Sequence, residues 1–222
     1  LDKFPVSKRA SNIEYAIRDV VVPANKLEKN GYNILKLNIG DPLEYSNFKT
    51  PQHMITAFNK ALMDQNNGYS SSYGIDDLRI SIAKYESNNY ISYKYDDVYI
   101  CHGVTEALQI IFASFLENGD KILSPGPHYP PYMAYPQLFG AETIEYRLNP
   151  SNGWDVDLDD LESKMDDKVR IVVLINPNNP TGSILSKKTI INIIEIVSKW
   201  PNCIIVSDEI YNKIIYDKKK HY

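Results

Sequence analysis

The stretch "VRIVVLINPNNPTG", residues 169–182, decides the fold class of this chain. Its first seven residues are aliphatic apart from Arg170, and such a run is typical of a strand buried on both faces of a parallel sheet. The strand then ends in two Asn-Pro pairs and a glycine, a rigid loop that carries three asparagine amides. A plain connection needs only one turn residue, so either this turn is unusually awkward or the loop holds something.

Strand-like and helix-like segments alternate along almost the whole chain. Strand patterns cover residues 33–39, 97–101, 121–124, 141–148, 169–175 and 203–207. Helical patterns cover residues 11–31, 50–65, 74–87, 105–119, 186–200 and 208–216. We expect Ser11 to cap the start of the first helix, Pro23 to kink or divide it, and Gly31 to end it. Together these patterns predict an α/β fold, a mostly parallel sheet with helices on both faces.

Composition narrows the class of protein. The chain has 222 residues, a net charge of −4 and an isoelectric point near 5.6, which argues against nucleic acid or an anionic membrane as the main partner. No run approaches the roughly 20 apolar residues that span a bilayer, and we expect a cytoplasmic protein. Cys101 and Cys203 lie in apolar runs and are interpreted as reduced core thiols. Because the chain starts at Leu1 and stops at Tyr222 without a terminating element, we expect it to be part of a longer protein.

Four of the predicted strands end in unusual residues. The segments that follow them are "CHGVTEA", "PGPHYPPY", "NPNNPTG" and "SDEIY". In open α/β sheets, ligands bind outside the carboxyl ends of the strands. We therefore expect these four segments to meet at one edge of the sheet.

The segment "HGVTEA" places Gly103 just before a predicted helix, with Val104 and Thr105 near its first turn. Free N–H groups and the helix dipole at such a terminus suit a phosphate, and Thr105 adds a hydroxyl. The alternative is that Thr105 is only an N-cap. No Walker pattern or GxGxxG motif accompanies it, so nucleotide binding gains little support.

The segment "SPGPHYPPY" carries Tyr129 and Tyr132 on a loop stiffened by proline. An aromatic ring with little freedom suits stacking on a flat ligand. Ordinary packing in the core is the alternative for each of the two tyrosines.

In "CIIVSDEIY", four apolar residues and one serine precede Asp208. A carboxylate at a buried strand end is costly unless it is paired or hydrogen-bonded. Asp208 either caps the following helix or needs a cationic partner, and a protonated heterocyclic nitrogen would serve. Tyr211, three residues later, presents a phenol. A phosphate cradle, a stacking tyrosine, an amide-rich loop, an acid and a phenol suit a phosphorylated, hydroxylated pyridine.

Six motifs in this order resemble the fold-type I, pyridoxal-phosphate-dependent class I and II aminotransferases. They are "LNIGDP", "NGYSSSYGIDDLR", "GVTEALQ", "PGPHYPPY", "NPNNPTG" and "SDEIY", and they extend over essentially the whole chain. The N-terminal stretch and "PGPHYPPY" are most similar to the alanine-aminotransferase-like branch. The resemblance implies an N-terminal arm and the start of a small domain in residues 1–50. It implies a cofactor-binding large domain, incomplete at its C-terminal end, in residues 51–222.

The resemblance assigns a role to each residue that contacts the cofactor, pyridoxal 5'-phosphate. The residues that match the phosphate-binding turn are Gly103, Val104 and Thr105. Tyr129 matches the ring that stacks on the pyridine, and Asp208 matches the acid paired with the pyridinium nitrogen. Tyr211 matches the phenol that is hydrogen-bonded to the ring hydroxyl oxygen.

Further assignments concern the substrate and the neighbouring subunit. Asn179 matches an amide that contacts the ring oxygen and helps hold the substrate carboxylate, and Gly40 matches a backbone position at the carboxylate site. Tyr69 matches a tyrosine that reaches the cofactor phosphate of a neighbouring subunit, which implies a homodimer with shared active sites. We also predict a cis peptide bond between Asn179 and Pro180.

The activity implied is transfer of an amino group between an amino acid, with alanine favoured, and a 2-oxo acid such as 2-oxoglutarate, through a Schiff base. The Schiff-base lysine lies beyond the "DEIY" match in this family and is absent here, as is the arginine that grips the substrate carboxylate. Lys213 and residues 218–220 match nothing in the lysine motif and are interpreted as a solvated charge run. The alternatives are another pyridoxal-phosphate enzyme, such as a carbon–sulfur lyase or decarboxylase, or a cofactor-binding module or fragment without turnover.

Overall fold

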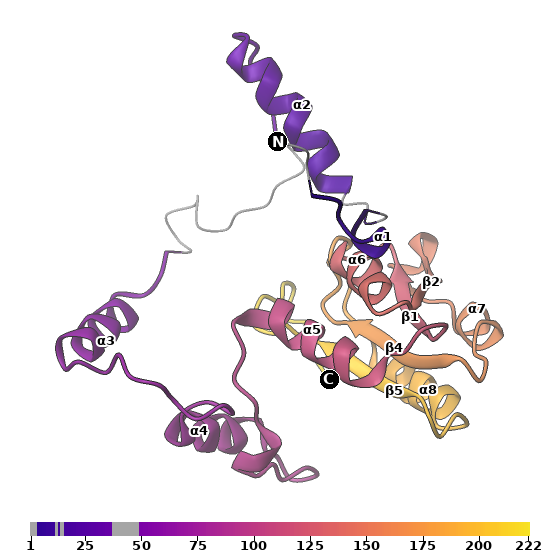
Figure 1. Cartoon of the computed structure of the whole chain (residues 1–222). Coiled ribbons are helices and arrows are strands. Elements are labelled where there is room, and N and C mark those ends of the chain that lie inside the picture. Colours follow the sequence, from indigo (N-terminus) through magenta and orange to yellow (C-terminus); the bar gives the residue numbers. More distant parts are fainter. Residues whose placement is uncertain (1–3, 12, 14–15, 37–48) are drawn as a thin grey trace. The chain divides into compact units, whose positions relative to one another are not determined.

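The computed structural model describes residues 4–11, 13, 16–36 and 49–222 of the chain, which fold as two compact units (Figure 1). The sheet unit consists of Leu1–Val20 and His102–Tyr222, and the helical unit consists of Val21–Cys101. The predicted domain division at residue 50 stays a prediction. In the part of the chain that the structure describes, no helix is both long and apolar enough to cross a membrane.

The sheet unit is built around five strands. They are β1 (Lys121–Gly126), β2 (Glu142–Asn149), β3 (Asp155–Val156), β4 (Val169–Ile175) and β5 (Ile204–Asp208). Their order across the sheet is β3-β2-β1-β4-β5, and only the short β3 runs antiparallel, beside β2. The mostly parallel sheet predicted from the aliphatic runs is confirmed.

Helices cover both faces of this sheet (Figure 1). They are α5 (Gly103–Phe115) and α6 (Pro131–Leu138) on one face, and α7 (Leu158–Ser163) and α8 (Lys187–Val197) on the other. Each face has its own core, and β4 contributes alternate residues to the two. Residues 171, 173 and 175 join α5 and α6, whereas residues 172 and 174 join α7 and α8. A strand segment buried on both faces needs apolar side chains at successive positions, which explains the aliphatic run from Ile171 to Ile175 in β4.

The parallel register brings the strand ends together. Ile175 at the end of β4 pairs with Asp208 at the end of β5, and the N–H of Asn176 donates to the carbonyl of Asp208 at 2.9 Å. The loops that follow β4 and β5 therefore start side by side at the carboxyl edge of the sheet.

The helical unit contains α3 (Gln52–Met63), α4 (Asp76–Glu86) and the 3₁₀ helix η3 (Tyr95–Asp97), and most of α2 (Ala16–Lys29). Helix α2 ends as predicted, with Gly31 in the left-handed region at φ +88°.

Four local predictions were wrong or partly wrong. Ser11 does not start the first helix, because it is the last residue of the short helix α1 (Lys8–Ser11). Pro23 lies inside α2 and does not divide it, and the predicted kink stays a prediction. Residues 33–36 are not in a strand, and the rest of the strand expected at 33–39 lies outside the described residues. The strand predicted at 97–101 does not form.

Residues 97–101 show why an apolar pattern alone does not make a strand. A strand needs a neighbour for its backbone hydrogen bonds, and among the described residues this run pairs with no strand. Ile100 donates to the carbonyl of Tyr73 at 3.0 Å instead.

The helix predicted at 208–216 is also wrong, because the chain forms turns there. Asn212 donates to the carbonyl of Glu209 at 2.9 Å and Ile214 to that of Tyr211 at 2.8 Å, a spacing of three residues that α helices lack. The Asp208 carboxylate accepts the N–H of Ile210 at 3.2 Å, which favours a local turn at this point.

Candidate functional site

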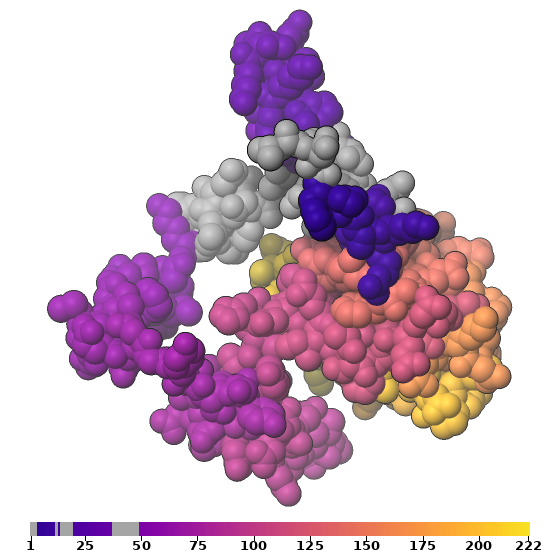
Figure 2. Space-filling model, in the orientation of Figure 1, coloured from indigo at the N-terminus to yellow at the C-terminus, as the bar shows by residue number. Residues whose placement is uncertain are grey.

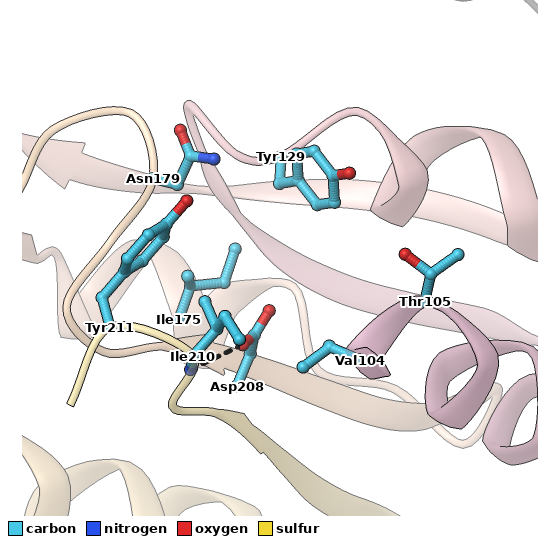
Figure 3. A pocket seen from close by; sticks show the side chains of 8 residues that line it. All are labelled: Val104, Thr105, Tyr129, Ile175, Asn179, Asp208, Ile210 and Tyr211. Carbon is cyan, nitrogen blue, oxygen red and sulfur yellow. Dashed lines mark hydrogen bonds between the residues drawn. The ribbon is translucent and has the colours of Figure 1, made fainter. Parts of the chain in front are cut away.

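A cavity of about 240 Å³ opens at the carboxyl edge of the sheet (Figure 3). It is lined by Val104, Thr105, Tyr129, Ile175, Asn179, Asp208, Ile210 and Tyr211. Six of these eight residues were singled out from the sequence, and they come from four separate segments. The structure thus brings the four unusual segments to one place, although only three of them follow a strand that forms.

Asp208 is the buried charge of this cavity. It is 6% exposed, and its two oxygens have separate donors. Oδ1 accepts from the N–H of Ile210, and Oδ2 accepts from the phenol of Tyr132 at 2.6 Å. Both donors are neutral, and none of the eight lining residues is a lysine or arginine. The side of the cavity at Asp208 therefore suits a ligand that supplies a positive charge.

The two tyrosines of "PGPHYPPY" have different places. Tyr129 lines the cavity, whereas Tyr132 lies in the first turn of α6 and is fully buried, and its phenol donates to Asp208. Burial, and then the hydrogen bond to Asp208, raise the pKa of Tyr132 far above its usual range. Sequence reasoning missed this contact because Tyr132 and Asp208 are 76 residues apart and no local signal links them.

The asparagine-rich loop after β4 has both structural and cavity-facing residues. Asn176 is buried and accepts the N–H of Leu185 at 3.0 Å, and Asn178 is buried and donates to Thr181 Oγ1 at 2.9 Å. Asn179 alone of the three lines the cavity, where Figure 3 shows its amide on the same side as the Tyr211 phenol. The predicted cis bond between Asn179 and Pro180 is confirmed. The loop thus presents one of its three asparagine amides to the cavity.

Helix α5 begins at the cavity with Gly103, whose φ of +76° strongly favours glycine. The N-cap is His102 rather than Thr105, so the alternative interpretation of Thr105 as the cap is wrong. The N–H of His102 donates to the carboxylate of Glu106 and lowers the pKa of Glu106. The first turn contributes Val104 and Thr105 to the cavity wall, with N–H groups that have no partner within the helix.

Comparison with known families decides the classification. The sequence model of "Aminotransferase class I and II" matches residues 32–222, which is most of the chain. The chain belongs to this family. The predicted resemblance is confirmed, and the cofactor of these enzymes is the predicted pyridoxal 5'-phosphate.

Curated relatives are close in sequence to this class I and II aminotransferase chain. An alanine aminotransferase of Mycobacterium tuberculosis (strain ATCC 25618 / H37Rv) is 36% identical over 221 residues, which covers 98% of this chain and 51% of the relative. A glutamate-pyruvate aminotransferase of Escherichia coli (strain K12) is 36% identical over 218 residues, which covers 97% of this chain and 53% of the relative. The chain therefore spans about half the length of the curated relatives it matches.

A solved structure of an alanine aminotransferase from Pyrococcus furiosus superposes with a TM-score of 0.93 at 42% identity. That match covers 98% of this chain and 55% of the other. The structural similarity supports the same fold class as the strand order and the two cores.

The residues of the cavity fit the cofactor of the family. A volume of about 240 Å³ lies below the roughly 300–1,000 Å³ of sites for drug-sized ligands, and so suits one substituted ring better than a dinucleotide. The buried Asp208 carboxylate, without a cationic side chain in the lining, complements a protonated ring nitrogen. The start of α5 complements a phosphate. Among the described residues, no cluster of three or more His, Cys, Asp or Glu suits a metal ion.

The structure tests neither of two other predicted site residues. Gly40 is outside the described residues. Tyr69 belongs to the helical unit and its side chain is fully exposed. The roles assigned to both residues stay predictions.

Proposed function

We propose that this protein is a pyridoxal-phosphate-dependent aminotransferase. It transfers an amino group between an amino acid, with alanine as the favoured donor, and a 2-oxo acid such as 2-oxoglutarate. The observation that carries the proposal is the buried carboxylate of Asp208 in a cavity whose lining residues include no cation. Alanine is favoured because two of the similar curated proteins are named alanine and glutamate-pyruvate aminotransferases.

When bound, the cofactor supplies an electron sink for the bond that breaks at the substrate's α-carbon. The residues of this chain bind and orient it. Asp208 holds the proton on the ring nitrogen, because a paired negative charge favours the protonated form. Tyr129 packs on the face of the ring, and Tyr211 hydrogen-bonds the ring hydroxyl oxygen.

Two further groups complete the proposed site. The first turn of α5, with Val104 and Thr105, binds the phosphate through N–H groups, the hydroxyl of Thr105 and the helix dipole. Asn179 offers its amide to the ring oxygen and the substrate carboxylate. Action in the cytoplasm as a homodimer is also part of the proposal, and the dimer is supported by the match of the exposed Tyr69 to a residue that reaches a neighbouring subunit.

Substitution of Asp208 tests the proposal. We expect Asp208→Ala to weaken binding of pyridoxal 5'-phosphate by about 10- to 100-fold, the size of one charge-assisted hydrogen bond, and to abolish measurable transamination. Binding is measured by absorbance titration, and activity by formation of glutamate from 2-oxoglutarate with alanine, aspartate or an aromatic amino acid as donor.

Asp159→Ala is the matched control, because Asp159 is an exposed acid on α7, away from the cavity. It should leave both measurements unchanged. Unchanged binding and turnover in Asp208→Ala would contradict the proposal. With S-methylcysteine as substrate, release of pyruvate, ammonia and methanethiol without glutamate formation would instead identify a carbon–sulfur lyase on the same scaffold.

A further inference from the structure

Tyr132 is held in place from three directions. Its N–H donates to the carbonyl of Tyr129 at 3.1 Å, and its carbonyl accepts from the hydroxyl of Thr143 at 2.7 Å. Its phenol donates to Asp208 Oδ2 at 2.6 Å, and the residue is 0% exposed. One tyrosine thus links Tyr129 and Asp208, the two cavity residues proposed to contact the face and the nitrogen of the ring.

These contacts fix the direction of the Asp208 carboxylate. A carboxylate has about four lone-pair sites, and here one on each oxygen is occupied. Ile210 donates to Oδ1 and Tyr132 donates to Oδ2, so rotation of the group would break a hydrogen bond at one side or the other. Because Asp208 also lines the cavity, the carboxylate keeps a lone pair available there.

The phenol of Tyr132 acts only as a donor. Burial raises the pKa of Tyr132 far above the pH range in which proteins work, and the hydrogen bond to Asp208 raises it further. The phenol is therefore protonated throughout this range and carries the proton that it donates to Asp208.

We propose that Tyr132 is a positioning residue, which holds the Asp208 carboxylate in the orientation that receives a protonated ring nitrogen. The inference rests on the proposed function, because it acts through the contact between Asp208 and the cofactor ring. It predicts that removal of the phenol oxygen weakens recognition of the ring nitrogen and spares the rest of the site.

Two probes separate this effect from a general loss of structure. Pyridoxine 5'-phosphate has the ring nitrogen but no aldehyde, so it binds reversibly, and its 1-deaza analogue carries a C–H in place of the nitrogen. The wild-type protein should bind pyridoxine 5'-phosphate more tightly than the analogue. In Tyr132→Phe that preference should shrink by about tenfold, the size of one hydrogen bond, while affinity for the analogue changes little.

Tyr146→Phe is the matched control. Tyr146 is also a buried tyrosine of the sheet unit, and its phenol donates to the carbonyl of Val173 at 2.7 Å, away from Asp208. This variant should keep the wild-type preference. In an Asp208→Asn background, Tyr132→Phe should no longer change the preference, because the two residues act as a pair.

Three results are decisive. The role of Tyr132 would be overturned if Tyr132→Phe lost affinity equally for both probes. It would also be overturned if neither affinity changed. A wild-type protein without any preference would overturn the proposed function itself, since Asp208 would then not meet the ring nitrogen. If Tyr132→Phe does not fold, Tyr132→His gives a second test, because its imidazole retains an N–H donor and should keep part of the preference.

Discussion

The two compact units differ in how far their local structure is supported by a core. The sheet unit has two clusters of buried side chains, one on each face of the sheet, with several residues that are completely inaccessible. Among the described residues of the helical unit, the buried positions are Arg79 and Ala83 on α4, and α3 has none. Figure 2 shows the sheet unit as a continuous packed mass.

The helical unit does not lack buried side chains because its helices are less amphipathic. Helix α3 has an apolar face like that of α8, formed by Met54, Ile55, Phe58 and Leu62, but these side chains are exposed by 40–66%. An amphipathic pattern therefore predicts the helix and the face that is suited to packing. Whether that face is buried depends on the elements that pack against it.

Arg79 is the exception within the helical unit. Its side chain is 5% exposed, and its guanidinium pairs with Asp76 at 3.0 Å and donates to the carbonyl of Val98 at 3.0 Å. It also lies over the rings of Tyr73 and Tyr95, at 5.3 and 4.9 Å from their centroids. A charged residue thus connects α4 to the segments before and after it, where no cluster of buried aliphatic side chains is present among the described residues.

The largest expected effect is a loss of stability when a core side chain of the sheet unit is truncated. Phe112→Ala should lower its free energy of unfolding by about 3–5 kcal/mol, because Phe112 is 0% exposed. Phe58→Ala on α3 should cost less than about 0.5 kcal/mol, because Phe58 is 66% exposed. Both tryptophans, Trp154 and Trp200, pack against the sheet core, so urea unfolding followed by fluorescence reports on this unit. Equal losses would remove the contrast between the units.

A smaller effect should follow from Arg79→Met in the helical unit. The substitution removes the ion pair with Asp76 and leaves the carbonyl of Val98 without this donor, at a cost of about 2 kcal/mol. Amide hydrogen exchange should become faster at Ile100, which donates to Tyr73. Lys84→Met, an exposed position on the same helix, is the control and should leave exchange unchanged. Unchanged exchange in Arg79→Met would mean that the arginine does not organise this unit.

The smallest effect concerns an ion pair at the surface of the sheet unit. Burial opposes the charge of Asp160, but hydrogen bonds from Lys164 and Arg147 outweigh burial and hold the pKa of Asp160 below its usual value. Because the folded pKa is lowered, this stabilisation is present above the unfolded pKa of about 4 and is lost as pH falls through the folded value.

Asp160→Asn should therefore cost about 1 kcal/mol at pH 7 and lessen the loss of stability on acidification. Urea unfolding between pH 3 and pH 7 measures both quantities. Asp64→Asn, which removes the exposed pair with Lys60 on α3, should have less effect at any pH. If the free energy of unfolding falls as steeply with acidification in Asp160→Asn as in the wild type, Asp160 is not the source of this pH dependence.

The sequence by itself determined the elements whose signals are local. The aliphatic residues of β1, β4 and β5 predict these strands, and the longest run, residues 171–175 in β4, is buried at every position. The rule that parallel strands present their carboxyl ends at one edge also placed Tyr129, Asn179, Asp208 and Tyr211 at the cavity. Val104 and Thr105 line it as well, although the strand predicted before them does not form.

Only the tertiary structure decided the contacts between distant residues. The apolar run at 97–101 is not a strand because no described strand pairs with it. After β5 the chain forms turns where the sequence pattern predicts a helix. The phenol that holds Asp208 belongs to Tyr132 and not to a residue near it in the sequence. A buried hydrogen bond of this kind depends on which side chains meet in three dimensions, and no periodicity or spacing along the chain records that.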